Sequence, residues 1–169
     1  HLGLLYGKKE ILDKLPNQNH EFLEGDVPYT LNPGGPNHEE LSCLVGVYEY
    51  FNNLFQHHFP GEDGSVREKI EKVNELINKH EQEIANPLLE YIKSRDDIKL
   101  IGKNKIENKN RAPTIAFTMN NKSSKELSSD LVKKGIATRN DNFYAWRCLK
   151  ALGIDVDDGV VRTSMVHYN

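Results

Sequence analysis

Arg162 lies within an apolar run, residues 160–166, that has the alternation of a half-buried strand. Side chains two residues apart in a strand share a face, so Arg162 is expected beside Val160, Ser164 and Val166. A guanidinium on a half-buried face needs a carboxylate or phosphate partner, because burying an unpaired charge is costly. The pattern predicts either an anion-binding arginine or an internal ion pair, and the spacing alone does not choose between them.

Arg139 is a second candidate of the same kind. It ends a short expected strand, residues 136–139, directly before the polar turn Asn140-Asp141-Asn142. An arginine at the end of a strand can bind an anion or pair with a nearby carboxylate, and both readings stay open for Arg139.

A third candidate is the turn Pro33-Gly34-Gly35-Pro36-Asn37, which opens an expected helix. The first turn of a helix has unpaired N–H groups and a partial positive charge, and glycines let an anion approach the backbone closely. The turn therefore has room for an anion. The pattern alone favours the alternative, a rigid turn that only starts the helix.

The remaining reactive side chains predict little chemistry. Cys43 and Cys148 are expected to be buried, inert thiols on amphipathic helices, with no activating base nearby. The adjacent His57 and His58 point apart on a helix, and no His, Cys, Asp or Glu set has metal-ligand spacing, so no metal site is expected. Two cysteines provide no disulfide framework, which favours a reducing, cytoplasmic compartment.

The elements that must position these residues alternate between helices and strands. Pro87 predicts a kink in the longest helix, or two abutting helices. The second half of the chain is expected to be an α+β domain behind that helix. The expected strands span residues 2–6, 98–101, 112–119, 136–139 and 160–166, and the expected helices span residues 8–15, 37–57, 65–94, 123–135 and 142–152.

Length and charge narrow the class of protein. The chain of 169 residues has the size of one domain, and its net charge of −3 gives no reason to expect a nucleic-acid or membrane-surface partner. No apolar stretch approaches the roughly 20 residues of a membrane span. Because the chain begins and ends inside expected strands, we expect it to be part of a larger protein.

Two segments resemble a known family. Residues 135–145 read GIATRNDNFYA and residues 161–169 read VRTSMVHYN. They resemble the patterns GIAVRxGxxCA and RaSlxxYN of class V aminotransferase-like enzymes, in particular the cysteine desulfurase and selenocysteine lyase branch. The opening GLLYGKKE and the turn Gly34-Gly35-Pro36-Asn37, which stands where the family has GTPN, extend the resemblance over essentially the whole chain.

This resemblance implies a C-terminal fragment of an α/β, fold-type-I enzyme that depends on pyridoxal 5'-phosphate (PLP) and works as a homodimer. Residues 1–62 would be the trailing part of the large PLP-binding domain. Residues 63–169 would form the long connecting helix and the α+β C-terminal small domain.

The resemblance also implies roles for individual residues. Arg162 would bind the α-carboxylate of an amino-acid substrate, with Arg139 and Tyr144 on the loop that faces the substrate. The turn of Gly34, Gly35 and Asn37 would contact the cofactor phosphate of the neighbouring subunit.

Three departures from the family pattern limit the implied chemistry. The PLP lysine is expected upstream of His1, so no catalytic residue is expected in this chain, which we expect to be inactive alone. Tyr144 stands where the desulfurases have their catalytic cysteine, and Cys148 lies one helical turn away. Gly35 replaces a threonine whose hydroxyl would contact the phosphate.

The leading hypothesis is thus a fragment of a PLP-dependent, desulfurase-like enzyme acting at the Cα or Cβ of an amino acid, as a lyase, desulfurase or aminotransferase. The alternative is a non-catalytic binding or interaction module that keeps the small-domain fold. A sulfur-transfer scaffold is a third possibility.

Overall fold

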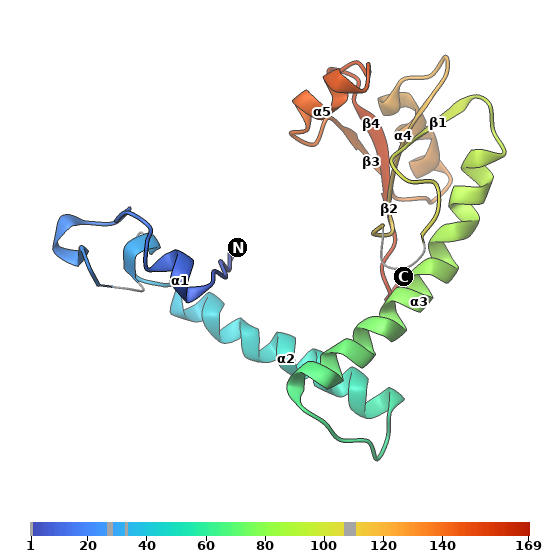
Figure 1. The fold of residues 1–169 in the computed structure, drawn as a ribbon. Coiled ribbons are helices and arrows are strands. Elements are labelled where there is room, and N and C mark those ends of the chain that lie inside the picture. The colour runs from blue at the N-terminus through green and yellow to red at the C-terminus, as the bar shows by residue number, and fades with distance from the viewer. Residues whose placement is uncertain (1, 27–28, 33, 107–110) are drawn as a thin grey trace. The chain divides into compact units, whose positions relative to one another are not determined.

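A computed structural model of the chain describes residues 2–26, 29–32, 34–106 and 111–169 (Figure 1). The chain divides into two compact units, residues 1–70 and residues 71–169. The predicted boundary at residues 62 and 63, and the assignment of the two parts to a large and a small domain, stay predictions.

The first unit contains helix α1 (Lys9–Leu12), two short 3-10 helices (Glu21–Leu23 and Tyr29–Leu31) and helix α2 (His38–His58). The strand predicted at residues 2–6 is wrong: these residues have no regular structure, and Tyr6 is 89% exposed. An apolar segment becomes a strand only when another strand accepts its backbone hydrogen bonds. Within the described residues, no strand pairs with this segment.

Helix α2 starts where its sequence predicts. Asn37 is the N-cap, and its Oδ1 accepts a hydrogen bond from the backbone N–H of Glu40 at 3.0 Å. Phe55 is the buried residue of this helix, and Lys69 Nζ lies 5.4 Å from its ring centroid. Cys43 is exposed, which corrects the expectation of a buried thiol, since the apolar stripe that suggested burial is uncovered around this position.

Helix α3 (Val66–Lys93) runs through Pro87 without a break, so the two-helix alternative is wrong. Pro87 removes one backbone N–H donor, yet the helix continues for six further residues, to Lys93, and Pro87 itself is exposed. Residues Ala85, Leu89 and Ile92 form the buried stripe of this helix. The helix therefore contributes an apolar face to the core of the second unit.

The second unit is built on a small antiparallel sheet of strands β1 (Ile98–Ile101), β2 (Thr114–Met119), β3 (Arg139–Asp141) and β4 (Val160–Ser164). The strand order is β1-β2-β4-β3, and every neighbouring pair is antiparallel. This mixed α/β arrangement is the fold class that the sequence predicts for the C-terminal part.

Strand β3 starts at Arg139, three residues later than the predicted strand 136–139. Residues 135 and 136 instead close helix α4 (Ser124–Lys133) with a glycine cap, in which Ile136 N–H donates to Leu131 O and Gly135 N–H to Val132 O. Gly135 has the positive φ of 79° that this cap requires. The structure therefore confirms Gly135 as the end of this helix, and it uses Ile136, which the sequence pattern assigned to a strand, in the cap.

The core of this unit lies on one face of the sheet. Strand residues Ile115, Phe117 and Val161 pack with the buried stripe of α3, and Leu127 and Leu131 of α4 pack against the same cluster. Because side chains alternate along a strand, Ala116 and Arg162 belong to the opposite face. The register confirms this, since Ala116 pairs with Arg162 and Phe117 with Val161.

Helix α5 (Trp146–Ala151) is shorter than the predicted helix 142–152. Phe143 and Tyr144 have positive φ values of 51° and 61°, which no α-helix accommodates, so the helix begins after them. Leu149 is the buried residue of α5, whereas Cys148 is exposed. The prediction of a buried Cys148 is wrong because the short helix buries only the neighbouring face.

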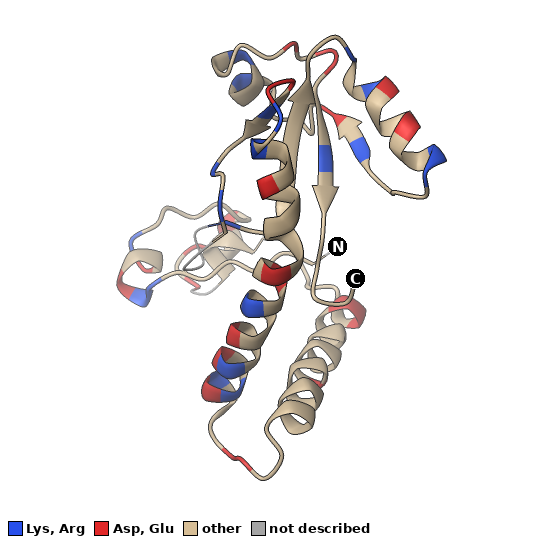
Figure 2. Ribbon diagram, turned by 90° about the vertical axis from the view of Figure 1, so that its right-hand side faces the viewer, with Lys and Arg blue, Asp and Glu red and all other residues tan. Residues whose placement is uncertain are grey.

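Charges of both signs are interspersed along α3 and α4 (Figure 2). None of the described helices combines the length and the apolar character that crossing a membrane requires.

Candidate functional site

Two arginines face each other across strands β3 and β4. Arg139 and Arg162 are direct partners in the antiparallel register, so their side chains leave the same face of the sheet. This is the face opposite the core. Arg162 is half-buried and Arg139 is exposed. The structure thus brings together the two arginines that the sequence analysis singled out separately.

A shallow pocket of about 230 Å³ lies at this pair. The hydroxyls that line it are tied to neighbouring strands and helices: Thr138 Oγ1 lies 3.0 Å from Ser128 Oγ, and Ser164 Oγ lies 3.4 Å from Thr114 Oγ1. The pocket therefore combines two guanidinium forks with two fixed hydroxyls. It is lined by Ala137, Thr138, Arg139, Arg162 and Ser164.

Phe143 holds the Arg162 side chain from one side. The Arg162 Cζ lies 4.1 Å from the centroid of the Phe143 ring, which is a close cation–π contact. The contact covers one face of the guanidinium and leaves its N–H groups available to a ligand. Arg162 is therefore oriented by an aromatic ring, and none of the ion pairs found among the described residues includes it.

The turn that presents Phe143 is held by Asn142. The Asn142 Oδ1 accepts a hydrogen bond from Tyr144 N–H at 3.1 Å, and its Nδ2 donates to Val156 O at 3.3 Å. Left-handed backbone costs a non-glycine residue on the order of 1 kcal/mol, and here two such residues follow each other. These hydrogen bonds offset that cost and fix the ring under Arg162.

Neither arginine has a carboxylate partner among the residues that the structure describes. The nearest acid along β3, Asp141, accepts a hydrogen bond from Asn142 N–H at 2.7 Å and makes no ion pair with Arg139. Like charges directly opposite in a sheet repel each other, so an anion between them lowers the free energy. Within the described chain, the internal ion pair that the sequence left open is therefore not formed.

Tyr144 does not line this pocket. Its side chain is fully exposed, at 101%, and its predicted contact with substrate stays a prediction. The aromatic residue that touches Arg162 is its neighbour Phe143, which the sequence analysis missed. No sequence signal marks this residue, because the positive φ that aims its ring is unusual for phenylalanine.

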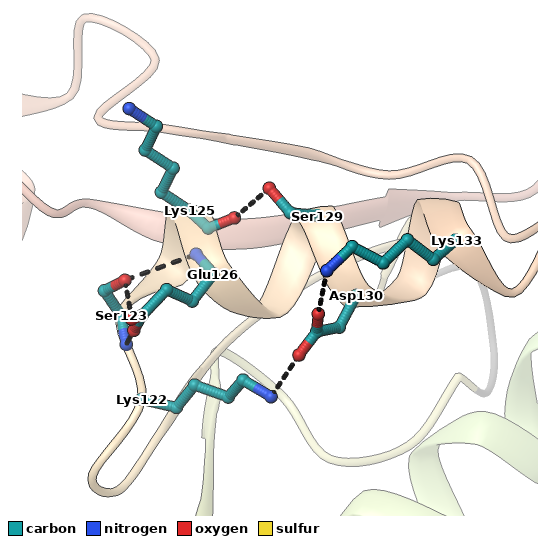
Figure 3. A network of polar contacts seen from close by, with 7 residues as sticks. All are labelled: Lys122, Ser123, Lys125, Glu126, Ser129, Asp130 and Lys133. Atoms are coloured by element: carbon teal, nitrogen blue, oxygen red, sulfur yellow. Dashed lines mark hydrogen bonds and ion pairs between the residues drawn. The ribbon is translucent and has the colours of Figure 1, made fainter.

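A second hollow, of about 620 Å³, lies over the start of α4. Figure 3 shows its polar network: Lys122 Nζ and Lys133 Nζ lie 2.5 and 3.0 Å from the two carboxylate oxygens of Asp130. Ser123 and Glu126 form the capping box that the sequence predicts. Because these charges are paired within the network, we assign it to stabilisation of the helix and not to ligand binding.

The network makes the stability of the second unit depend on pH in the acidic range. The hydrogen bond from Lys122 is the main cause that lowers the pKa of Asp130 from 3.8 to about 2, and Lys133 adds to it. Since the folded pKa lies below the unfolded one, the stabilisation is complete above the unfolded value and is lost as pH falls through about 2. We expect Asp130→Asn to make urea-induced unfolding less dependent on pH between about 4 and 2.

The matched control for this experiment is Asp96→Asn, which removes an exposed carboxylate that has no ion-pair partner among the described side chains. It is expected to leave the pH dependence of the parent chain unchanged. Equal pH dependence in Asp130→Asn and the parent would contradict the assignment.

The predicted phosphate turn lies in the first unit. Gly34 and Gly35 are exposed, and a Cβ at either position would meet nothing within 4 Å, so the backbone there is open to a ligand. Asn37 Oδ1 is used by the helix cap, which leaves its Nδ2. Pro33 of this turn lies outside the described residues. The role of Gly34, Gly35 and Asn37 stays a prediction.

The described residues contain no group of three or more His, Cys, Asp or Glu side chains arranged to hold a metal ion. This leaves the two arginines and the glycine turn as the candidate ligand-binding features.

Comparison with known proteins gives the family. The model of the family Aminotransferase class-V matches residues 68–169, which is more than half of the chain. The chain belongs to the class V aminotransferases. It is also 28% identical, over 172 aligned residues, to the Aminotransferase-like protein FGM3 of Gibberella zeae; the match covers 100% of this chain and 39% of that relative.

The class V match includes the whole second unit and with it the pocket of Arg139 and Arg162. The glycine turn before α2 lies outside the residues that the family model covers, although the alignment with the Gibberella zeae relative includes it.

Class V aminotransferases depend on PLP, and features of this chain fit parts of that cofactor's environment. The open backbone at Gly34 and Gly35, just before a helix N-terminus, suits a phosphate group. The paired arginines suit the carboxylate of an amino acid that reacts with the cofactor.

Proposed function

We propose that this chain is the substrate-binding, C-terminal part of a PLP-dependent, cysteine desulfurase-like enzyme that acts at the Cα or Cβ of an amino acid. The observation that carries the proposal is the pair Arg139 and Arg162, placed on the open face of the sheet without a carboxylate partner among the described residues. The chain spans 39% of the length of its Gibberella zeae relative, so the activity is proposed for a protein longer than this chain.

Arg162 is the proposed anchor for the α-carboxylate. A planar guanidinium binds a carboxylate through two parallel hydrogen bonds, which sets the rotation of the amino acid as well as its position. Phe143 keeps the fork oriented before substrate arrives, so little side-chain entropy is lost on binding. This orientation decides which bond at Cα faces the reactive part of the site.

The cofactor is expected to be held by groups from more than one place. The backbone N–H groups at Gly34 and Gly35, with the Asn37 amide, are proposed to bind the phosphate of the cofactor in a homodimer. The lysine that carries PLP is proposed to lie outside these residues. Bound PLP withdraws electrons from the amino acid, which makes bonds at Cα easier to break.

The reaction type follows in part from Tyr144. This residue stands at the position where desulfurases have a nucleophilic cysteine, and a phenol cannot accept sulfur as a persulfide. The proposed reactions are therefore β-elimination, racemisation or transamination. Cys148 is exposed and lies on α5, four residues after Tyr144, so it does not stand at the position of the desulfurase cysteine.

The visible absorbance spectrum of the full-length gene product tests this proposal. We expect a band of lysine-bound PLP that borohydride reduces and that shifts when an amino-acid substrate is added. The absence of this band, even after incubation with PLP, would contradict the proposed PLP-dependent activity. It would favour the alternative, a non-catalytic binding module.

A further inference from the structure

We propose that the substrate carries a second anionic group besides its α-carboxylate, and that Arg139 binds this group. The inference rests on the proposed function, because it assigns Arg162 to the α-carboxylate. It names a substrate class: α-amino acids with an anionic side chain, such as a carboxylate or a sulfinate.

The pocket is lined by two cationic side chains, Arg139 and Arg162. One carboxylate is satisfied by one guanidinium fork, and Arg162 supplies that fork. Arg139 lies directly opposite on β3, and the Cα atoms of such cross-strand partners are about 4.5–5.5 Å apart. Like charges at directly opposite positions of neighbouring strands are destabilising, and a single carboxylate neutralises only one of them.

Among the residues that the structure describes, no acid forms an ion pair with Arg139. Asp141, two residues along the same strand, is directed to the backbone N–H of Asn142. The other groups that line the pocket are Thr138 and Ser164, which carry hydroxyls, and Ala137, which is apolar. The counter-charge for Arg139 is therefore expected from the ligand.

The two arginines differ in exposure and in how firmly their side chains are held. Arg162 is half-buried and held against Phe143, so its position is fixed for the invariant part of a substrate. Arg139 is exposed, and no aromatic ring of the described residues is recorded against its guanidinium, so its side chain is able to adjust to the variable side chain of a substrate. Thr138, which precedes Arg139 in the sequence, also lines the pocket, and its Oγ1 lies 3.0 Å from Ser128 Oγ.

The test compares anionic and neutral amino acids with the full-length protein. We expect Arg139→Gln to weaken the binding of L-aspartate, L-glutamate and L-cysteine sulfinate about tenfold, and that of L-alanine less than about twofold. Arg139→Lys, which keeps the charge, is expected to restore part of the loss. Arg147→Gln, on the exposed surface of α5 and outside the pocket, is the matched control.

A second measurement needs no catalysis. Succinate and butyrate have four carbons each, but only succinate has two carboxylates. We expect succinate to raise the melting temperature of the full-length protein more than butyrate does, and Arg139→Gln to abolish that difference.

The inference would be overturned if Arg139→Gln weakened aspartate and alanine equally, or if succinate and butyrate stabilised the protein equally. Failure of the proposed function shows differently, as the absence of a borohydride-sensitive PLP band. The succinate experiment does not depend on that band, so the two failures are distinguishable.

Discussion

Replacing Arg162 with glutamine is expected to raise the KM for every amino-acid substrate of the full-length protein by about 10- to 100-fold. A hydrogen bond to a charged group contributes about 1.5–3 kcal/mol, and each 1.4 kcal/mol corresponds to a factor of ten. Glutamine keeps the aliphatic part of the side chain but removes the charge, the fork and the guanidinium carbon that lies over the Phe143 ring. Steady-state kinetics with several amino acids measures the effect.

The cofactor provides the internal control for this variant. Arg162 lies in the second unit, on the face of the sheet opposite the core, and is not assigned to the phosphate. The absorbance band of lysine-bound PLP is therefore expected to stay unchanged in Arg162→Gln. A loss of both the band and substrate binding would indicate a structural role for the arginine.

Arg162→Lys separates charge from geometry. Lysine keeps the positive charge but loses the planar fork, so we expect a KM between those of the parent and the glutamine variant. Arg162→Gln is expected to weaken the binding of all amino acids, because the α-carboxylate is common to all of them. Arg139→Gln is expected to weaken mainly the binding of anionic amino acids, and by a smaller factor. Unchanged binding of all amino acids by Arg162→Gln would contradict the assigned role.

Parts of this fold follow directly from local sequence rules. The N-cap Asn37 and the capping box of Ser123 and Glu126 form where the sequence predicts, because each depends on side chains only three residues apart. The strand around Arg162 is likewise recognised from its alternation, which requires a buried and an open face. Rules that act over a few residues are therefore the ones that the structure confirms.

The predictions from sequence fail where strand pairing or burial depends on residues that are distant in the sequence. Residues 2–6 have the composition of a strand, but no neighbouring strand pairs with them in the described chain. Cys148 matched the buried stripe of a longer helix, and it is exposed because α5 starts only at Trp146. Burial and pairing depend on contacts that periodicity does not encode.

The candidate site was predictable in its residues but not in its geometry. Arg139 and Arg162 each stood out as strand arginines, yet their spacing of 23 positions does not reveal that they are direct partners across β3 and β4. The contribution of Phe143 depends on two consecutive left-handed residues, which no propensity rule predicts. The site therefore arises from strand register and an unusual turn, both of which are set by tertiary structure.

The register itself depends on Gly159, and Gly159→Ala is expected to destabilise the second unit by about 3–5 kcal/mol. Gly159 is buried, with a positive φ of 69°. A Cβ there would lie 2.3 Å from the carbonyl carbon and oxygen of Asp141 and 2.7 Å from the N of Asn142. These are backbone atoms, so relief requires moving β3 away from β4. Denaturant unfolding measures the loss.

Gly153→Ala is the matched control, because it separates the clash from the backbone conformation. Gly153 has the same φ of 69°, but a Cβ there would meet nothing within 4 Å. In this variant the free energy of unfolding should therefore fall only by the cost of a left-handed alanine, about 1–2 kcal/mol. The difference between the two variants is the contribution of the close approach between Gly159 and the end of β3.

Gly159→Ala also links stability to the site. Asp141 pairs with Val160, and two residues along the same ladder Arg139 pairs with Arg162. Moving the end of β3 to accommodate a Cβ shifts Arg139 away from Arg162. Under conditions where Gly159→Ala remains folded, we therefore expect succinate to stabilise it no more than butyrate does. Equal stability of Gly159→Ala and Gly153→Ala would contradict the close packing of β3 on Gly159. It would also contradict the fixed spacing of the two arginines.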